Sequence, residues 1–194
     1  MVKKSRETKD KVQKIRMLML AIKNLIQREA YNLDLMVINQ SGRGIESPFS
    51  IVALDNELQS FLKNDFAIGV EVRGEKESYI EHAIIEGLNK EGLSIAPKGQ
   101  SGDLIVKGEV EFKDVYTPNP TFKFIRWTAN FKLIEKNTDK VIGSINRSGK
   151  EGHITIEGAK ERALKTMQEE IVNEVGKKLT DFIYQYHGIL DKAQ

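Results

Sequence analysis

The sequence predicts an α+β fold, in which a mixed, largely antiparallel sheet is packed by helices. Two kinds of periodicity lead to this prediction. Apolar and polar side chains alternate over residues 103–116, which is typical of a strand with one wet face, and two further strand-like segments follow. Residues 7–30 and 155–187 instead carry apolar side chains three and four positions apart. We therefore expect an amphipathic N-terminal helix and a long C-terminal helix around the sheet.

The helix expected at residues 7–30 carries an apolar stripe that must be covered by the domain or by a partner. We take this stripe as a candidate interaction face: Val12, Ile15, Met19, Ile22 and Ile26. The apolar run at 33–38 either extends this helix or forms a brief strand, since periodicity cannot decide at that length. A second helix is expected up to Asn64, with Ser47 as its N-cap and Pro48 at its first position.

The central region predicts a strand, a helix and a strand. Residues 66–72 are short and apolar, as are residues 93–96. Between them, Ser78 and Glu81 have the spacing of a capping box, and Gly92 stands where a left-handed helix end is expected. These three elements are expected to form one βαβ crossover, which would make the sheet mixed.

Three longer strands are expected to follow as a meander, over residues 103–116, 122–135 and 141–148. The apolar parity changes along the second strand, which predicts a bulge or a strong twist near Ile125. Thr155 is expected to cap the final helix, in which Gly158 and Gly176 are places where it could bend. We expect two domains: an N-terminal helical arm with its connecting helix at 1–64, and the sheet domain at 65–194.

Composition narrows the classes of function. Of the 194 residues, 30 are Lys or Arg and 28 are Asp or Glu, so the formal net charge is only +2. This balance disfavours a nucleic-acid binder. The chain has no cysteine, which excludes disulfide scaffolds, thiolate metal sites and cysteine nucleophiles. Residues 1–30 hold nine basic and three acidic residues, so a peripheral contact with an anionic membrane surface or another polyanion stays open.

No catalytic constellation is apparent in the sequence. The three histidines, His82, His153 and His187, lack the spacing of a metal site. The glycines at 143 and 149 are too far apart for a phosphate loop. We therefore expect no enzyme activity, no metal and no cofactor. One enzyme hypothesis stays open, because backbone N–H groups at the start of the helix near Ser78 could hold an anionic substrate.

The longest apolar run near the start is Met17–Ile22, which is too short for a bilayer span or for the core of a secretory signal. The sequence as given therefore predicts no export signal. We expect the cell envelope or the periplasm if a leader has been removed, and the cytoplasm otherwise.

Two segments carry a resemblance to a known group of proteins. One is the strand Asp103-Leu-Ile-Val-Lys-Gly108. The other is the hairpin turn, Lys132-Leu-Ile-Glu135 followed by Thr138-Asp-Lys-Val141, with Asp139 where glycine is usual. They resemble bacterial cell-envelope α/β modules such as the TolB N-terminal domain, the curli-secretion lipoprotein, penicillin-binding-protein activator lipoproteins and flagellar accessory lipoproteins. The resemblance covers residues 66–187 and implies a non-enzymatic module that self-associates or docks onto envelope proteins. It assigns no functional residues.

The leading hypothesis is therefore an assembly or scaffold module of the bacterial cell envelope. It would act through sheet edges and helix faces, as a homo-oligomer or with an envelope protein partner. The alternatives are a membrane-surface or polyanion binder that uses the basic N-terminal helix, and an unrecognised small-molecule enzyme.

Overall fold

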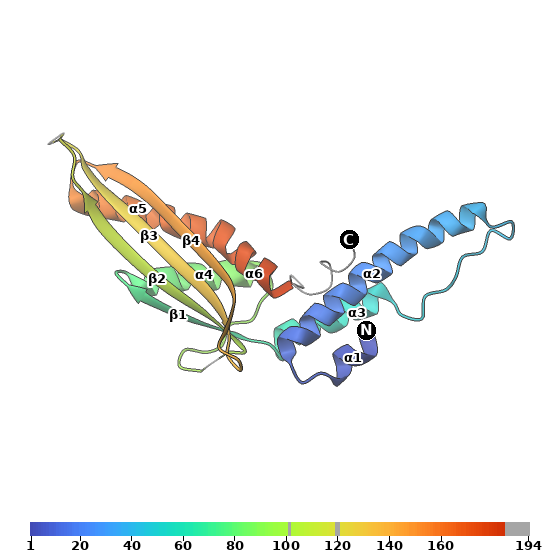
Figure 1. Cartoon of the computed structure of the whole chain (residues 1–194). Helices are drawn as coiled ribbons and strands as arrows, with labels where there is room; N and C mark the ends of the chain where they lie inside the picture. Colours follow the sequence, from blue (N-terminus) through green and yellow to red (C-terminus); the bar gives the residue numbers. More distant parts are fainter. Residues whose placement is uncertain (101, 119–120, 185–194) are drawn as a thin grey trace. The chain divides into compact units, whose positions relative to one another are not determined.

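The computed structural model describes residues 1–100, 102–118 and 121–184 (Figure 1). Contacts between Cα atoms divide the chain into two compact units. Of the described residues, unit 1 comprises Met1–Asp65 together with Ile183 and Tyr184, and unit 2 comprises Phe66–Phe182. The predicted domains, 1–64 and 65–194, stay a prediction. Each unit is described by itself below.

Unit 1 is built from three helices, α1 (Val2–Glu7), α2 (Lys11–Ile38) and α3 (Ile51–Asn64). The Asp10 side chain caps α2 by accepting a hydrogen bond from the Gln13 N–H at 2.9 Å. The first half of α2 buries its apolar side against the unit, through Val12, Ile15, Leu18, Ala21 and Leu25. The apolar run at 33–38, for which a helix and a strand were both open, continues α2 as a helix.

The predicted start of the second helix is wrong by one turn. α3 begins at Ile51, and Ser50 is its N-cap, because the Ser50 hydroxyl accepts the hydrogen bond from the Ala53 N–H. The Ser47 hydroxyl instead bonds the backbone carbonyl of Phe49 at 2.8 Å, within a local turn. Ser47 and Ser50 are equally good caps by residue type, so the choice depends on this turn.

Unit 2 is a four-stranded sheet in the order β1–β2–β3–β4, with helices on one face (Figure 1). Its strands are β1 (Ile68–Gly74), β2 (Leu104–Val115), β3 (Lys123–Glu135) and β4 (Lys140–His153). β1 pairs with β2 in parallel, and the other two pairings are antiparallel. The helix α4 (Glu77–Lys90) connects the parallel pair. The predicted mixed, largely antiparallel α+β fold is therefore confirmed.

The core of unit 2 lies between the sheet and its helices. β3 sends every second side chain into it, because successive residues of a strand point to opposite faces. The fully buried members on β3 are Ile125, Trp127, Ala129, Phe131 and Leu133. α4 contributes Ile80, Ile84 and Leu88 from the other layer. Burying large apolar side chains is worth about 1.5–3 kcal/mol each, so this layer supplies much of the stability of the unit.

Of the bulge or strong twist predicted near Ile125, the bulge is wrong and the twist stays a prediction. β3 keeps a continuous register with β2 from Phe124 to Glu135, and the irregularity in its pairing with β4 lies between Leu133 and Ile134. Phe124 changes the apolar pattern because it lies on the wet face, where the Lys150 ammonium is 4.4 Å from the centre of its ring. The change of apolar pattern thus comes from a half-buried aromatic side chain on the wet face, in a strand whose pairing is regular there.

Two predictions about the crossover also need correction. The Ser78–Glu81 capping box does not form: Lys76 is the N-cap of α4, with φ of 58°, and makes no side-chain cap hydrogen bond. Residues 93–96 make a single parallel bridge, Ile95 to Ile68, so the strand that pairs along β1 is β2. Gly92 does adopt the predicted left-handed conformation, with φ of 77°.

The C-terminal helix begins at the predicted cap, where the Thr155 hydroxyl accepts a hydrogen bond from the Gly158 N–H. It consists of α5 (Ile156–Glu170), a π-helical segment η1 (Ile171–Val175) and α6 (Gly176–Tyr184). The irregularity thus lies directly before Gly176, one of the two glycines named from the sequence. The predicted end near His187 lies outside the described residues.

Candidate docking surfaces

The outer edge of β1 is paired only at its beginning. The Ile68 N–H donates to the Ser94 carbonyl, and the Ala96 N–H donates to the Ile68 carbonyl, both at 2.9 Å. Because alternate residues of a strand bond to the same side, Val70 and Val72 direct their N–H and C=O groups to this edge as well. In the described part of the chain, no backbone segment pairs with them. β1 therefore offers an open strand edge beyond the point where the chain leaves it at Pro97.

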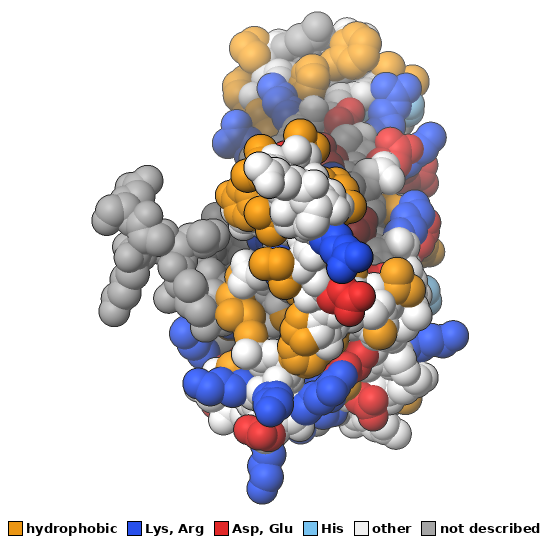
Figure 2. Space-filling model, turned by 90° about the vertical axis from the view of Figure 1, so that its right-hand side faces the viewer, with side chains coloured by type: hydrophobic (Ala, Val, Ile, Leu, Met, Phe, Trp, Pro, Cys, Tyr) orange, Lys and Arg blue, Asp and Glu red, His pale blue; other side chains and the backbone are white. Residues whose placement is uncertain are grey.

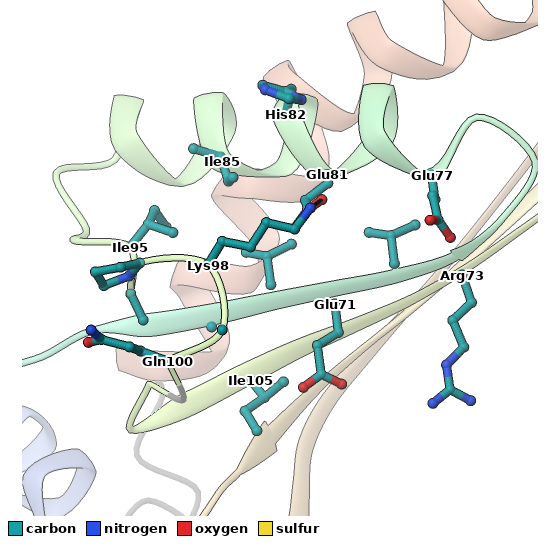
Figure 3. A pocket seen from close by; sticks show the side chains of 16 residues that line it. Glu71, Arg73, Glu77, Glu81, His82, Ile85, Ile95, Lys98, Gln100 and Ile105 are labelled. Carbon is teal, nitrogen blue, oxygen red and sulfur yellow. Dashed lines mark hydrogen bonds and ion pairs between the residues drawn. The ribbon is translucent and has the colours of Figure 1, made fainter.

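A hollow of about 660 Å³ runs along this open edge. Figure 3 shows that its side chains come from both faces of β1. Glu77, Glu81 and Ile85 of α4 lie on one side, together with Lys98 from the following loop. On the other side lie Glu71, Arg73 and Ile105. A fifth strand placed beside β1 would send its side chains alternately into these two halves.

The charges in the hollow favour a ligand that brings positive charge. Its walls carry three carboxylates, Glu71, Glu77 and Glu81, against two cations, Arg73 and Lys98. Lys98 is engaged with Glu81, with Nζ 3.3 Å from Oε2. Near Ile85 and Ile95 the lining is apolar. The hollow thus combines an apolar part near Ile85 and Ile95 with a charged part that includes Glu71, Arg73 and Glu77.

The anion site considered at the start of α4 meets unfavourable electrostatics. Glu77 is the first residue of the helix and lines the hollow, so a carboxylate already lies where the helix dipole favours negative charge. Glu81 follows one turn later on the same wall. These carboxylates would repel an anionic substrate at this helix start.

The five residues of the predicted interaction face have different environments. Val12 and Ile15 are buried inside unit 1, whereas Met19 and Ile22 are half-buried. Ile26 is 56% exposed. The role of this face in binding stays a prediction, and among its members Ile26 has the most accessible side chain.

Several basic residues of the N-terminal region are engaged within unit 1. The Arg6 guanidinium lies 2.7 Å from the Glu57 carboxylate, and this contact lowers the pKa of Glu57 and raises that of Arg6. The Lys14 ammonium lies 4.2 Å from the centre of the Phe61 ring. Lys11 donates a hydrogen bond to the Asp65 carbonyl. These contacts hold the basic side chains to the surface of their own unit.

The two histidines that the structure describes, His82 and His153, have separate local partners. His82 lies within hydrogen-bond distance of the Ser78 carbonyl, and His153 lies near Thr155, while His187 is outside the described residues. No group of three His, Asp or Glu side chains suited to a metal ion occurs among the residues that the structure describes. Within those same residues, no helix is long and apolar enough to cross a bilayer.

The sequence predicts docking through sheet edges but does not identify the outer edge of β1 as the open one. Its only signal is the brevity of the apolar segment 93–96 before Pro97, which leaves most of β1 unaccompanied on that side. The end of α2 was also not recognised as a surface. Its apolar run at 33–38 was noted, but nothing in the sequence showed that the run stays exposed.

Comparison with known proteins gives matches to solved structures at low sequence identity. No protein-family model and no curated protein sequence matches the chain. Among solved structures, the protein XCC0632 from Xanthomonas campestris, of the DUF330 family, is 13% identical with a TM-score of 0.46, over 61% of this chain and 86% of that one. A minor lipoprotein from Acinetobacter baumannii is 10% identical with a TM-score of 0.41, over 61% and 90%. The PelC dodecamer from Paraburkholderia phytofirmans is 15% identical with a TM-score of 0.40, over 62% and 88%.

Proposed function

We propose that the chain is a non-enzymatic assembly module of the bacterial cell envelope, which works by binding other proteins. The observation that carries the proposal is the open edge of β1 beside its hollow. Val70 and Val72 present backbone donors and acceptors in the geometry of a strand, so an extended segment of a partner can add to the sheet. Backbone hydrogen bonds would supply affinity, and the two halves of the hollow would select side chains.

The chemistry of the hollow supports binding rather than turnover. Its carboxylates come from β1 and α4 and lie along a strand edge, and Glu81 is neutralised by Lys98. An exposed strand edge is a hazard that proteins usually cover or blunt, so an edge left open beside a lined hollow favours a partner there. The envelope as the location rests on the resemblance carried by residues 103–108 and 132–141.

In-cell photo-crosslinking tests this function. A photoreactive amino acid is placed at Gln100, which lines the hollow, in the protein expressed in its native bacterium. We expect adducts with a protein of the envelope fraction. The matched control carries the photoreactive residue at Lys165, an exposed position on α5, and should give no such adduct.

The variant Val72→Pro then tests the mode of binding. Proline removes the N–H that Val72 directs to the open edge, while the hydrogen bonds of β1 to β2 come from the alternate residues. The adducts from Gln100 should be lost, provided that thermal unfolding shows a folded variant. Adducts that persist in Val72→Pro, or that are the same from Lys165, would contradict strand addition at this edge.

A further inference from the structure

The far half of α2 carries an apolar stripe that unit 1 does not use. Ile26, Leu33 and Val37 are 56%, 63% and 86% exposed, and Ala30 between them is exposed too. The four residues follow one another at spacings of four, three and four, which places them on one line along the helix. We call them the α2 seam. Figure 2 looks onto this end of α2 and shows hydrophobic side chains gathered around it.

The α2 seam continues the line of the helix on which Val12 and Ile15 are buried, but its own side chains are exposed. Leu18, Ala21 and Leu25 are buried on another side of α2, about 120° round the helix axis from the seam at 100° per residue. The loop after α2 is held on that same side. The Arg28 guanidinium donates to the carbonyls of Ile45 and Glu46 at 2.9 and 2.8 Å, and the Ile45 N–H donates to the Asn32 side chain at 2.6 Å. These hydrogen bonds hold the loop on a side of α2 away from the seam, so the loop does not cover the seam.

We propose that the α2 seam pairs in an antiparallel sense with the α2 seam of a second copy of this chain. A four–three spacing of apolar residues is the pattern that lets two helices interdigitate their side chains. Antiparallel pairing sets Ile26 opposite the partner's Val37 and sets Ala30 opposite the partner's Leu33. In the two central layers the large Leu33 side chain thus packs against the small Ala30 side chain of the other copy, which allows the helices to approach closely.

The charges beside the α2 seam select the antiparallel orientation. In a parallel pair, Glu29 lies opposite the partner's Asp34, and the symmetry repeats this repulsion. An antiparallel pair separates these carboxylates and brings Gln27 near the partner's Asp34, where an amide can donate a hydrogen bond. The seam itself contains no charged residue between Ile26 and Val37. A second copy therefore satisfies both the apolar pattern and the charges.

This pairing extends the proposed assembly function to self-association, but it rests on unit 1 alone. Sedimentation equilibrium of the full chain over micromolar to submillimolar concentrations is the test. We expect a reversible dimer that Leu33→Glu weakens by about tenfold or more, since a charge would be buried in the apolar layer. Asn24→Glu is the matched control, because Asn24 is exposed on the same helix but lies about 150° round its axis from the seam. It should leave the dimer unchanged.

A second pair of variants tests the orientation. Gln27→Lys should tighten the dimer by about three- to fivefold, since it creates two ion pairs with Asp34, and Gln27→Glu should loosen it similarly. In a parallel dimer Gln27 lies opposite the partner's Ile22, so neither variant would act in this way. A response to Leu33→Glu without any response at Gln27 overturns the antiparallel arrangement.

Other outcomes overturn the pairing as a whole. A chain that stays monomeric throughout, or a dimer that ignores Leu33→Glu, contradicts it. Binding of the monomer to anionic phospholipid vesicles that is lost in Leu33→Glu would instead assign the seam to a membrane surface. Val72→Pro should leave the dimer intact, so failure of the seam and failure of the β1 edge give distinguishable results.

Discussion

At the scale of single residues, the contact between Arg6 and Glu57 ties α1 to α3. Arg6 Nη2 lies 2.7 Å from Glu57 Oε2, and this hydrogen bond is the main reason why the pKa of Glu57 is lowered. A carboxyl with a lowered pKa in the folded state stabilises that state only while it is ionised. The Arg6 side chain is exposed and that of Glu57 is half-buried at the surface, so solvent screens the pair and its effect on stability is small.

The pH dependence of Glu57→Gln follows from the direction of this shift. The stabilising contribution of Glu57 is fully present above the pKa that the residue has in the unfolded chain. It is lost as the pH falls through the lower pKa of the folded state. We expect Glu57→Gln to unfold at a slightly lower temperature than the wild type at neutral pH, and at the same temperature in strong acid. A difference that persists in acid would show that the variant acts through packing.

The residues of the resembling motif have structural roles. The Asp103 carboxylate accepts a hydrogen bond from the Ala67 N–H at 3.0 Å, and the Asp103 N–H donates to the Ala67 carbonyl. Asp139, where glycine is usual, has φ of 52° and lies in the left-handed region that glycine adopts without strain. The residues of the motif thus stabilise the pairing of two strands and the turn of a hairpin. This explains why the resemblance assigns no site residues.

At the scale of elements, a pair of glycines sets how closely α4 approaches the C-terminal helix. A Cβ on Gly176 would lie 2.7 Å from the carbonyl carbon of Gly87 and 2.8 Å from its Cα. Both atoms belong to the backbone, so a side chain there cannot be accommodated by turning another side chain away. The π-helical segment η1 ends at Val175, the residue directly before Gly176.

Gly176→Ala should therefore lower the free energy of unfolding of unit 2 by about 1–3 kcal/mol, which is the usual cost of overpacking. Urea unfolding followed by Trp127 fluorescence measures this, because Trp127 is fully buried in the core of the unit. Lys177→Ala, at the next and exposed position, is the control and should change the free energy by less than about 0.5 kcal/mol. Equal stability of wild type and Gly176→Ala would show that the two helices can move apart freely.

The elements that were predictable from sequence are those whose pattern comes from the core. The alternation of β2 and β3 and the spacing of α5 reflect burial of one face, so their positions followed from the residues alone. Helix starts were less predictable, since Ser47 and Ser50 are equivalent by residue type. A sheet edge was expected to bind a partner, but which edge is open could not be predicted. The place of a strand in the sheet depends on its pairing, which its local sequence pattern does not show.

At the scale of the whole molecule, each unit carries its own surface for another protein. Unit 2 has a strand edge with backbone groups and an acidic, partly apolar hollow. Unit 1 has an uncharged seam suited to a second copy. A module with two separate surfaces of this kind can join a partner to an assembly of its own copies, which is the role that we propose for the chain.

The central claim is that β1 has an open edge at which a partner strand binds. Amide hydrogen exchange, read residue by residue, tests it most directly. In the isolated chain, the amides of Val70 and Val72 should exchange much faster than those of Glu71 and Arg73, which face β2. When the chain is bound to the envelope fraction of its own bacterium, Val70 and Val72 should become as protected as their neighbours. Protection of Val70 and Val72 in the isolated chain, or continued fast exchange in the bound chain, would contradict the account.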